Sequence, residues 1–256
     1  MKKIIISIVT LFSSFAVFAN EALIINTGSE SGGFKAVLSM VGEKLDHKFV
    51  QANNPIVAAQ YFDEKNILTM WSTEWPADPK FPSVDINEDT IVALQVYETI
   101  MCSRKYNSLN EMNGDIVKIA TWGDSPPVEK FLKSLGESNN INFKIVPYGG
   151  SGSTTRGYLG KDADTIFTIQ TRQSKVESDG NCFAFSSNGD LNFSFVDVVL
   201  SVNTDKQSLN NWRNVVSQLM KTESWKTSFD GTETYVCNGS CPSLVSRVNS
   251  VIELHQ

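Results

Sequence analysis

The sequence predicts an α/β protein made of two βαβ lobes with a cleft between them. Apolar segments with strand character alternate with amphipathic helical segments, which is the signature of parallel strands joined by right-handed crossovers. This alternation starts twice along the 256 residues, and long apolar segments separate the two occurrences. We therefore expect one lobe to comprise 20–103 and 193–256, and the other to comprise 104–192.

The first lobe is expected to begin with three strands and two helices. In order, these are a strand at 22–26, a helix at 34–45, a strand at 49–52, a helix at 56–63 and a strand at 67–71. Apolar residues recurring at helical spacing indicate the first helix, because Phe34, Val37, Leu38, Val41 and Leu45 fall on one face. The polar segment 74–89, which contains three prolines, is expected to be a loop.

The second lobe is expected to repeat the pattern. The run 90–101 is rich in β-formers and should carry the chain from one lobe to the other. The expected elements then are a helical turn at 109–112, a strand at 116–122, a helix at 126–135, a strand at 143–147, a short helix at 154–159 and a strand at 165–169. The segment 193–203 should cross back, and amphipathic helices at 209–220 and 243–254 should complete the first lobe.

Polar, glycine-rich breaks follow the expected strands. They lie at 28–33, 53–54, 72–73, 123–125 and 148–153. In an open α/β sheet the carboxyl ends of the strands meet at a ligand crevice, so five such breaks predict a shared binding cleft. Ordinary turn chemistry, which also selects Gly, Asn and Ser, is the alternative. The spacing of the break at 28–33 matches neither a P-loop nor a dinucleotide fingerprint.

Four aromatic residues lie at or beside these breaks: Trp71, Trp75, Trp122 and Tyr148. Aromatic side chains there could form the walls of a cleft and stack on a ligand. Packing at the edge of the core is the alternative for each of them.

The N-terminus is typical of a secretory signal peptide. Lys2 and Lys3 precede an apolar segment at 4–18, and Val17 and Ala19 provide the small residues expected before a cleavage site. A retained membrane anchor is the alternative, but the apolar segment is shorter than the roughly 20 residues that a spanning helix needs. We therefore expect 1–19 to be removed and the mature chain to lie outside the cytoplasm.

Four cysteines remain after this segment: Cys102, Cys182, Cys237 and Cys241. An even number in an exported chain indicates two disulfides, and three pairings are possible. Cys237–Cys241 closes a short loop whose Gly239 permits a tight turn, and Cys102–Cys182 would then be the long-range bond. A metal site is the alternative for Cys237 and Cys241, but no histidine or second cysteine pair accompanies them. We expect neither a metal nor a cofactor.

The composition argues against two further classes of function. A formal net charge of -6 disfavours binding to nucleic acid or to an anionic membrane, although backbone N–H groups can still hold a small anion. Neither histidine, His47 or His255, lies at the end of an expected strand, so a Ser-His-Asp triad is not indicated. We therefore expect a binding protein and not an enzyme. The alternative is a secreted α/β hydrolase whose nucleophile is Ser72, Ser151 or Ser153.

Several segments resemble the periplasmic solute-binding proteins of tripartite tricarboxylate transporters, the TctC or Bug family. The strand, Gly32-Gly33 loop and helix at 24–45 are similar to the opening of that family, as are the Asn-containing loop in 50–59 and the polar strand end at 72–73. The best match is Val-Pro-Tyr-Gly-Gly at 146–150 followed by Leu-Gly-Lys-Asp-Ala-Asp at 159–164. The resemblance covers about 22–75 and 115–170. The chain departs from the family at Phe34-Lys35, where an Asp is common, and at Gly149, where Lys is common.

The resemblance implies a type 2 periplasmic-binding fold, in which two crossing strands join the lobes and backbone amides hold a ligand carboxylate. Transferred by position, the expected ligand-binding residues are Ser29, Gly32, Gly33, Asn53, Ser72, Thr73, Gly123, Asp124, Tyr148 and Gly149. The resemblance also implies location in the periplasm. The expected function there is capture of a small organic anion, a carboxylate, by a monomer that delivers it to a membrane permease. Because of the departures at Lys35 and Gly149, an interaction protein of the same fold that has lost its ligand remains an alternative.

Overall fold

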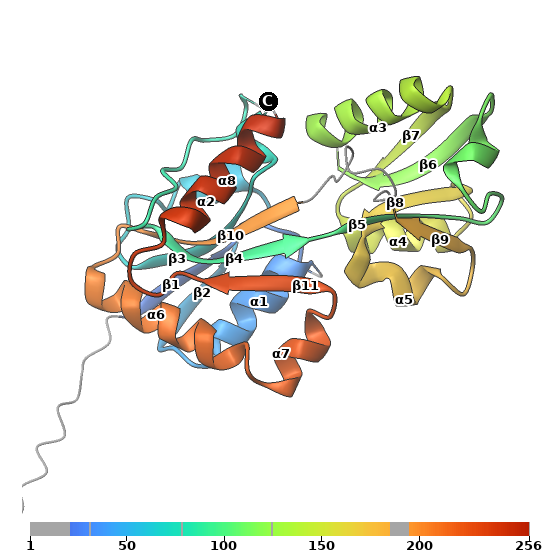
Figure 1. Ribbon diagram of the computed structural model, residues 1–256. Coiled ribbons are helices and arrows are strands. Elements are labelled where there is room, and N and C mark those ends of the chain that lie inside the picture. The colour runs from blue at the N-terminus through green and yellow to red at the C-terminus, as the bar shows by residue number, and fades with distance from the viewer. Residues whose placement is uncertain (1–20, 31, 78, 124, 185–194, 256) are drawn as a thin grey trace, which may run out of the picture.

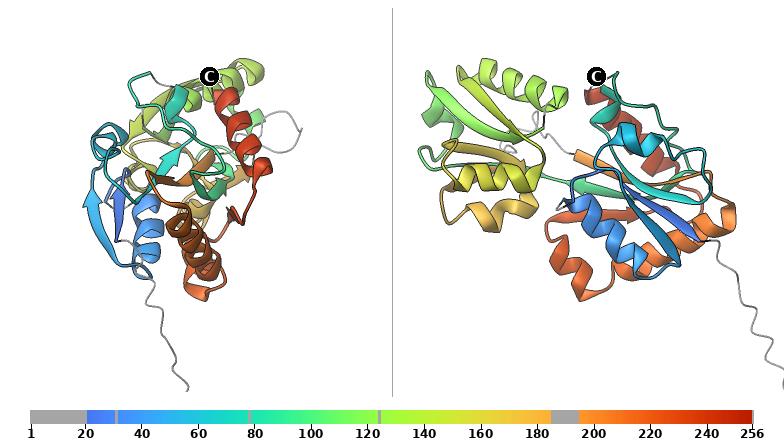
Figure 2. Two further views of the ribbon diagram at one scale, coloured as in Figure 1. Left: turned by 90° about the vertical axis from the view of Figure 1, so that its left-hand side faces the viewer. Right: turned by 180° about the vertical axis from the view of Figure 1, so that it is seen from behind.

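Two β-sheets, each covered by helices, divide the chain into two lobes that lie side by side (Figure 1, Figure 2). The computed structural model describes residues 21–30, 32–77, 79–123, 125–184 and 195–255. The expected signal peptide lies outside the described residues. The predicted α/β fold with two lobes is confirmed. No helix in the described part of the chain is long and apolar enough to cross a membrane.

The sheet of the first lobe has six strands in the order β11-β4-β10-β3-β1-β2. They are β1 (Ala22–Asn26), β2 (His47–Gln51), β3 (Ile67–Ser72), β4 (Ile91–Tyr97), β10 (Phe195–Val202) and β11 (Thr232–Val236). As predicted, β1 pairs in parallel with β2 and β3. β10 is antiparallel to both β3 and β4, so the returning segment lies in the middle of the sheet.

Helices cover both faces of this sheet. They are α1 (Gly33–Gly42), α2 (Pro55–Ala59), α6 (Lys206–Leu219), α7 (Glu223–Ser228) and α8 (Pro242–His255). Leu38 of α1, Trp212 of α6 and Trp225 of α7 pack on one face. On the other face, Val248 of α8 packs against Trp71 and its neighbours, and α2 contributes Ala58.

The sheet of the second lobe has five strands in the order β7-β6-β8-β5-β9. They are β5 (Thr99–Ser103), β6 (Ile116–Trp122), β7 (Asn142–Tyr148), β8 (Thr165–Ile169) and β9 (Asn181–Ala184). Its α-helices are α3 (Pro126–Asn139), α4 (Ser151–Leu159) and α5 (Gln173–Val176), and short 3-10 helices occur at Trp75–Ala77, Leu109–Met112 and Gln170–Arg172. The parallel β6–β7 and β6–β8 pairs correspond to the predicted strands, whereas β5, β9 and β11 were not predicted as separate strands.

The chain changes sheets at Glu98. β4 ends at Tyr97 in the first sheet, and β5, which starts at Thr99, pairs with β8 and β9 in the second. The backbone N–H of Gln170 donates to Glu98 O at 2.8 Å beside this crossing. Lobe boundaries at 103/104 and 192/193 stay a prediction. The strands on either side of Glu98 belong to different sheets, so the chain passes from the first lobe to the second at Glu98.

The structure contains the disulfides Cys102–Cys182 and Cys237–Cys241. Cys102 and Cys182 are directly opposite each other on β5 and β9. Cys237 and Cys241 enclose the short loop between β11 and α8. Each bond therefore joins segments that the backbone already places side by side.

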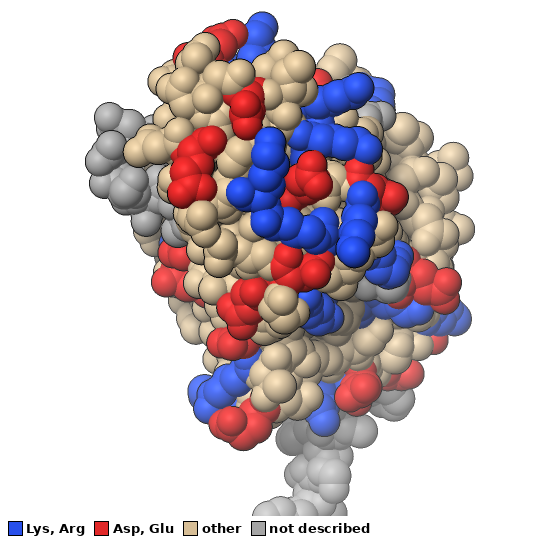
Figure 3. All heavy atoms as spheres, turned by 90° about the vertical axis from the view of Figure 1, so that its right-hand side faces the viewer, with Lys and Arg blue, Asp and Glu red and all other residues tan. Residues whose placement is uncertain are grey.

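Charge is unevenly distributed over the surface. Lys and Arg side chains gather on the outer side of the second lobe, with Asp and Glu side chains among them (Figure 3). Exposed Lys118 and Lys144 are directly opposite each other on β6 and β7. Like charges in such a cross-strand position repel each other. The net acidic charge of the chain therefore does not describe this face.

Candidate ligand-binding site

A cavity of about 1150 Å³ lies between the two lobes. The first lobe lines it with the loop from β1 to α1, the residues that follow β3 and the turn from α7 to β11. The second lobe contributes the loops that follow β6, β7 and β8. The carboxyl ends of parallel strands in both lobes thus border one cleft, as is typical of ligand sites in open α/β sheets.

The N-terminus of α1 borders the cavity in the first lobe. Gly32 precedes the helix without a capping side chain, and the backbone N–H of Gly32 donates to Ser29 O at 3.0 Å. The turn is tight, since a Cβ atom at Gly32 would lie 2.8 Å from Ser29 Oγ. The first amide groups of a helix lack intrahelical acceptors and carry partial positive charge, so this end of α1 can accept an anion.

The N-terminus of α4 borders the cavity from the second lobe. Gly150 precedes this helix with a φ of 145°, a conformation that is essentially restricted to glycine. Gly149, Ser151 and Gly152 line the cavity with it. The two lobes therefore present uncapped helix N-termini to the same space. At α3, which also begins at the cavity, Pro126 lacks the N–H that would serve this purpose.

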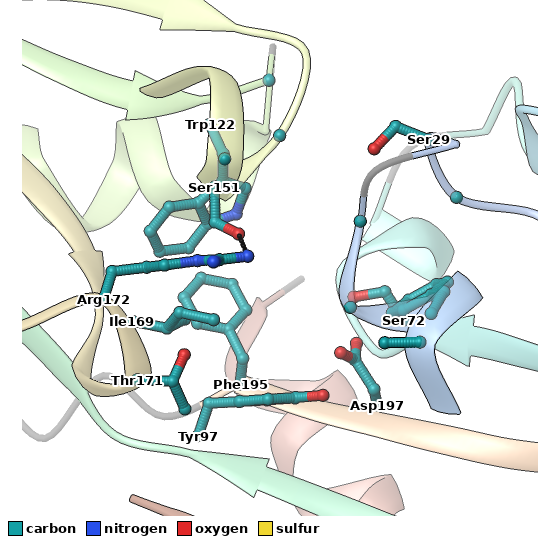
Figure 4. A pocket seen from close by; sticks show the side chains of 18 of the residues that line it. Ser29, Ser72, Tyr97, Trp122, Ser151, Ile169, Thr171, Arg172, Phe195 and Asp197 are labelled. Carbon is teal, nitrogen blue, oxygen red and sulfur yellow. Dashed lines mark hydrogen bonds between the residues drawn. The ribbon is translucent and has the colours of Figure 1, made fainter. Parts of the chain in front are cut away.

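Arg172 brings a positive charge into the cavity from the second lobe. It ends the 3-10 helix that follows β8, and its side chain extends into the cavity near Trp122, Ser151 and Phe195 (Figure 4). Its Nη2 donates to Ser151 Oγ at 3.5 Å, while its buried Nε has no hydrogen-bond partner. Burial lowers the pKa of Arg172, but an arginine stays protonated at neutral pH. The guanidinium therefore has spare donors for an anion.

Two carboxyl groups of the first lobe face the same space. Asp197 lies on β10, and Glu74 follows β3. Burial raises the pKa of Asp197 well above its usual value, repulsion from Glu74 adds to this, and hydroxyls of Ser72 and Tyr97 oppose it. Burial also raises the pKa of Glu74, to about 7, against hydrogen bonds from Ser125 and Trp122. Both groups are half-buried, so water screens them only partly.

Glu74 connects the lobes across the cavity. Trp122 Nε1 donates to Glu74 Oε1 at 3.1 Å, and Ser125 Oγ donates to Glu74 Oε2. Glu74 belongs to the first lobe, whereas Trp122 ends β6 and Ser125 precedes α3 in the second. This contact holds the lobes together on one side of the cleft.

Aromatic rings form part of the walls. Trp122 stacks on Phe167 at 5.3 Å between ring centroids and meets Phe195 edge-on at 4.6 Å. In the first lobe, Trp75 lines the cavity and contacts buried Trp71, with 4.8 Å between the ring centroids. Trp75 and Trp122 therefore border the cleft, whereas Trp71 supports Trp75 from the core.

The structure brings together six of the residues expected to bind ligand. Those that line the cavity are Ser29, Gly32, Gly33, Ser72, Gly123 and Gly149. Three do not line it: Asn53 accepts from Gln51 Nε2 at 2.7 Å, Thr73 is buried, and Tyr148 donates to Asp162 Oδ2 at 2.9 Å. Asp124 lies outside the described residues. The binding role of all ten stays a prediction.

Sequence reasoning missed the charged groups of the cavity, Arg172, Asp197 and Glu74. Arg172 follows the expected strand 165–169, so the rule about strand ends applied to it as well. Asp197 interrupts an otherwise apolar run, and a charge inside a buried strand is itself a sign of function. Glu74 lies two residues beyond β3 in a segment expected to be a loop.

The serines considered as nucleophiles lie in different surroundings. Ser72 and Ser151 line the cavity, whereas Ser153 Oγ accepts from Arg156 Nη2 at 3.1 Å. His47 lies at the amino end of β2, where its Nδ1 is 3.1 Å from Leu45 O. The cavity lies at the opposite, carboxyl end of the parallel strands.

The two sheets and the cavity between them define a two-lobed α/β architecture with a cleft between the lobes. No protein-family model and no curated protein sequence matches the chain. Solved structures do match it. A TctC solute-binding protein from Polaromonas is similar with a TM-score of 0.60 and 13% identity, over 92% of this chain and 96% of that one.

Two further similar structures come from Rhodopseudomonas palustris. One protein, solved with adipate, has a TM-score of 0.70 and 10% identity, over 91% of this chain and 94% of its own. MatC, solved with bound malate, has a TM-score of 0.66 and 12% identity, over 92% of this chain and 99% of its own. At such identities the likeness establishes the fold. The chain thus has the fold of periplasmic solute-binding proteins that the sequence resemblance implied.

Proposed function

We propose that this protein is an extracytoplasmic solute-binding protein that captures a small molecule with a carboxylate group and delivers it to a membrane permease. Its fold, shared with periplasmic solute-binding proteins, supports this role in preference to catalysis. The neighbours solved with malate and adipate support a carboxylate as the recognised group.

The observation that carries the proposal is that Arg172 lies in the cavity with unused hydrogen-bond donors. Its buried Nε has no partner, and its guanidinium lies in a cavity bordered by two uncapped helix N-termini. A half-buried cation whose buried Nε lacks a partner costs free energy, which an incoming carboxylate would offset through charge-assisted hydrogen bonds. In this proposal the carboxylate binds Arg172 and backbone N–H groups of the loops at 28–33 and 149–152.

Movement of the lobes would complete binding. The described crossing at Glu98 is a single residue between two strands, which is a suitable place for a hinge. Closure would exclude water from the cavity and strengthen the hydrogen bonds to the ligand. A molecule the size of malate or adipate would then be held by both lobes at once.

Thermal unfolding of the purified chain with a panel of carboxylates tests the proposal. Binding to the native state alone stabilises it by about 2.7 kcal/mol at a ligand concentration 100 times Kd. We expect at least one carboxylate to raise Tm, Arg172→Gln to abolish the rise, and Arg156→Gln, on the exposed face of α4, to preserve it. A flat response to carboxylates, amino acids and phosphates would contradict a solute-binding role.

Export is the other part of the proposal. Expression of the full chain in a bacterium with a periplasm, followed by N-terminal sequencing of the periplasmic fraction, should identify a mature protein that begins at Asn20. Recovery of the uncleaved chain from the membrane fraction would instead support a retained anchor.

A further inference from the structure

A row of polar side chains crosses the sheet of the first lobe at the cavity. Asp197 on β10 is directly opposite Ser72 on β3 and Gln95 on β4, and Gln95 is directly opposite Thr234 on β11. Residues in such cross-strand positions share one face of a sheet. Asp197 and Ser72 line the cavity, and Gln95 is fully buried beside them.

The adjacent row on the same face is apolar. Met70, Val199, Ala93 and Val236 occupy it, two positions further along the same four strands. These residues pack under α1, α6 and α7. The change from apolar to polar therefore coincides with the end of the helical cover and the beginning of the cavity. We refer to Ser72, Asp197, Gln95 and Thr234 as the polar row.

The polar row has unused hydrogen-bonding capacity. Gln95 Oε1 accepts from the Tyr97 hydroxyl, but Gln95 Nε2 is buried without a partner, as is Thr234 Oγ1. None of the ion pairs among the described residues involves Asp197. Of the four residues, Asp197 and Ser72 line the cavity, and Gln95 and Thr234 extend the polar row into the lobe. Native proteins satisfy nearly all buried polar groups, so a polar occupant is expected to meet the row at Asp197 and Ser72.

The balance of charge inside the cavity indicates the kind of occupant. Among the described lining residues, Lys80, Lys175, Glu177 and Asp230 are exposed at the rim. The half-buried charges are one cation, Arg172 of the second lobe, and two carboxyls, Glu74 and Asp197 of the first. Figure 4 shows Arg172 and Asp197 on opposite sides of the cavity. A ligand with only negative charge would satisfy Arg172 but would be repelled by Asp197 and Glu74 whenever these carboxyls are ionised.

We propose that the ligand is a zwitterion, a small carboxylic acid that also carries an ammonium group. Its carboxylate binds Arg172, and its ammonium group binds Asp197 at the polar row. This inference rests on the proposed carboxylate-binding function and narrows its substrate class. The two charged groups of the ligand are then bound by different lobes, so binding and closure are coupled.

The competing arrangement is a dicarboxylate that receives a hydrogen bond from protonated Asp197. The two arrangements respond oppositely to pH, because ammonium binding needs ionised Asp197 and the competitor needs its protonated form. The groups beside Asp197 are Glu74 and the Ser72 and Tyr97 hydroxyls, and Arg172 lines the same cavity from the second lobe. Glu74, whose pKa is raised to about 7, also gains negative charge as the pH rises. Its ionisation therefore favours ammonium binding, as ionisation of Asp197 does.

Isothermal titration with ligands of matched skeleton distinguishes the two arrangements. The probes are succinate against aspartate, glutarate against glutamate, adipate against 2-aminoadipate, and butyrate against 4-aminobutyrate. We expect at least one amino compound to bind ten times more tightly than its partner and to gain affinity between pH 6 and pH 8. Asp197→Asn should weaken binding of that compound at least tenfold without weakening binding of the matched compound that lacks the amino group. Asp230→Asn at the rim should change neither affinity.

Each contrary result has a distinct meaning. If the carboxylates without an amino group bind at least as tightly as their amino counterparts and lose affinity as pH rises, the zwitterion inference is wrong and carboxylate binding stands. If none of the eight probes, nor any member of the wider panel, binds, the proposed function itself is wrong. The Tm and circular dichroism spectrum of ligand-free Asp197→Asn establish that the variant is folded.

Discussion

The side chains of Glu74 and Trp122 meet across the cleft, where Trp122 Nε1 donates to Glu74 Oε1 at 3.1 Å. Glu74→Ala removes this contact and the hydrogen bond from Ser125. We expect the lobes of the ligand-free variant to separate further on average, since fewer contacts hold the cleft together. Small-angle X-ray scattering should then give a larger radius of gyration than for the wild type.

Glu177→Ala is the matched control for this measurement. Glu177 also lines the cavity, but its carboxylate accepts from Gln173 within the second lobe. The control should scatter like the wild type. Superimposable profiles for wild type and Glu74→Ala would show that this contact does not restrain the lobes.

The stability of the ligand-free protein should fall as pH rises from 5 to 8, in part because of Glu74. Its pKa in the folded chain, about 7, exceeds the ordinary value of 4.5, so folding strengthens proton binding. The resulting stabilisation is complete below about pH 4.5 and is lost as pH rises through 7. A shift of this size corresponds to about 3 kcal/mol. The raised pKa of Asp197 acts with the same sign.

Guanidinium unfolding at several pH values measures this effect. Between pH 5 and pH 8, Glu74→Gln should lose on the order of 2–3 kcal/mol less stability than the wild type, because the amide does not titrate. Glu137→Gln, on an exposed position of α3, should follow the wild type. Parallel curves for Glu74→Gln and wild type would mean that Glu74 has an ordinary pKa.

Gly150 and Gly152 form a matched pair of substitutions in one loop. Gly150→Ala places a side chain at a φ of 145° and should destabilise the fold by about 1–3 kcal/mol. Gly152 lies in α4, where an added Cβ meets nothing within 4 Å, so Gly152→Ala should be neutral or stabilising by up to about 1 kcal/mol. Urea unfolding compares the two variants. Equal destabilisation would contradict the assigned backbone conformation of Gly150.

The two disulfides should contribute unequally to stability. Cys102–Cys182 spans 80 residues and Cys237–Cys241 spans 4. The loop-entropy relation gives about 4.5 kcal/mol for the long loop and about 2 kcal/mol for the short one. Double serine variants of each pair, compared by urea unfolding without reductant, should reproduce this order. The reverse order would show that native contacts around the short loop dominate.

The parallel core of both lobes could be predicted because each βαβ unit is local in sequence and strongly patterned. The antiparallel strands were harder, since β9 and β11 are short, only partly buried and paired with distant segments. Their residues therefore lack the alternation or apolar run that marks a strand. The start of α4 at Ser151, before the expected 154, reflects a glycine-rich stretch whose helical propensity is low.

The candidate site was predicted only where it depends on loops that follow parallel strands. Ser29, Gly32 and Gly149 line the cavity for that reason. Asp197 reaches it because β10 is inserted antiparallel between β3 and β4, which no local pattern specifies. Tyr148 follows the same strand-end rule as Gly149, but its hydroxyl bonds to Asp162 and its ring lies against Gly157.

The bond between Cys102 and Cys182 has a consequence for proteolysis. It ties the strand that enters the second lobe to the last described strand of that lobe, so 102–182 form a covalent ring. A protease that cuts once inside this ring cannot release a fragment, and the two pieces stay attached until the bond is reduced. Under the proposed export, the lobe that carries Arg172 would thus remain attached to the molecule after a single nick.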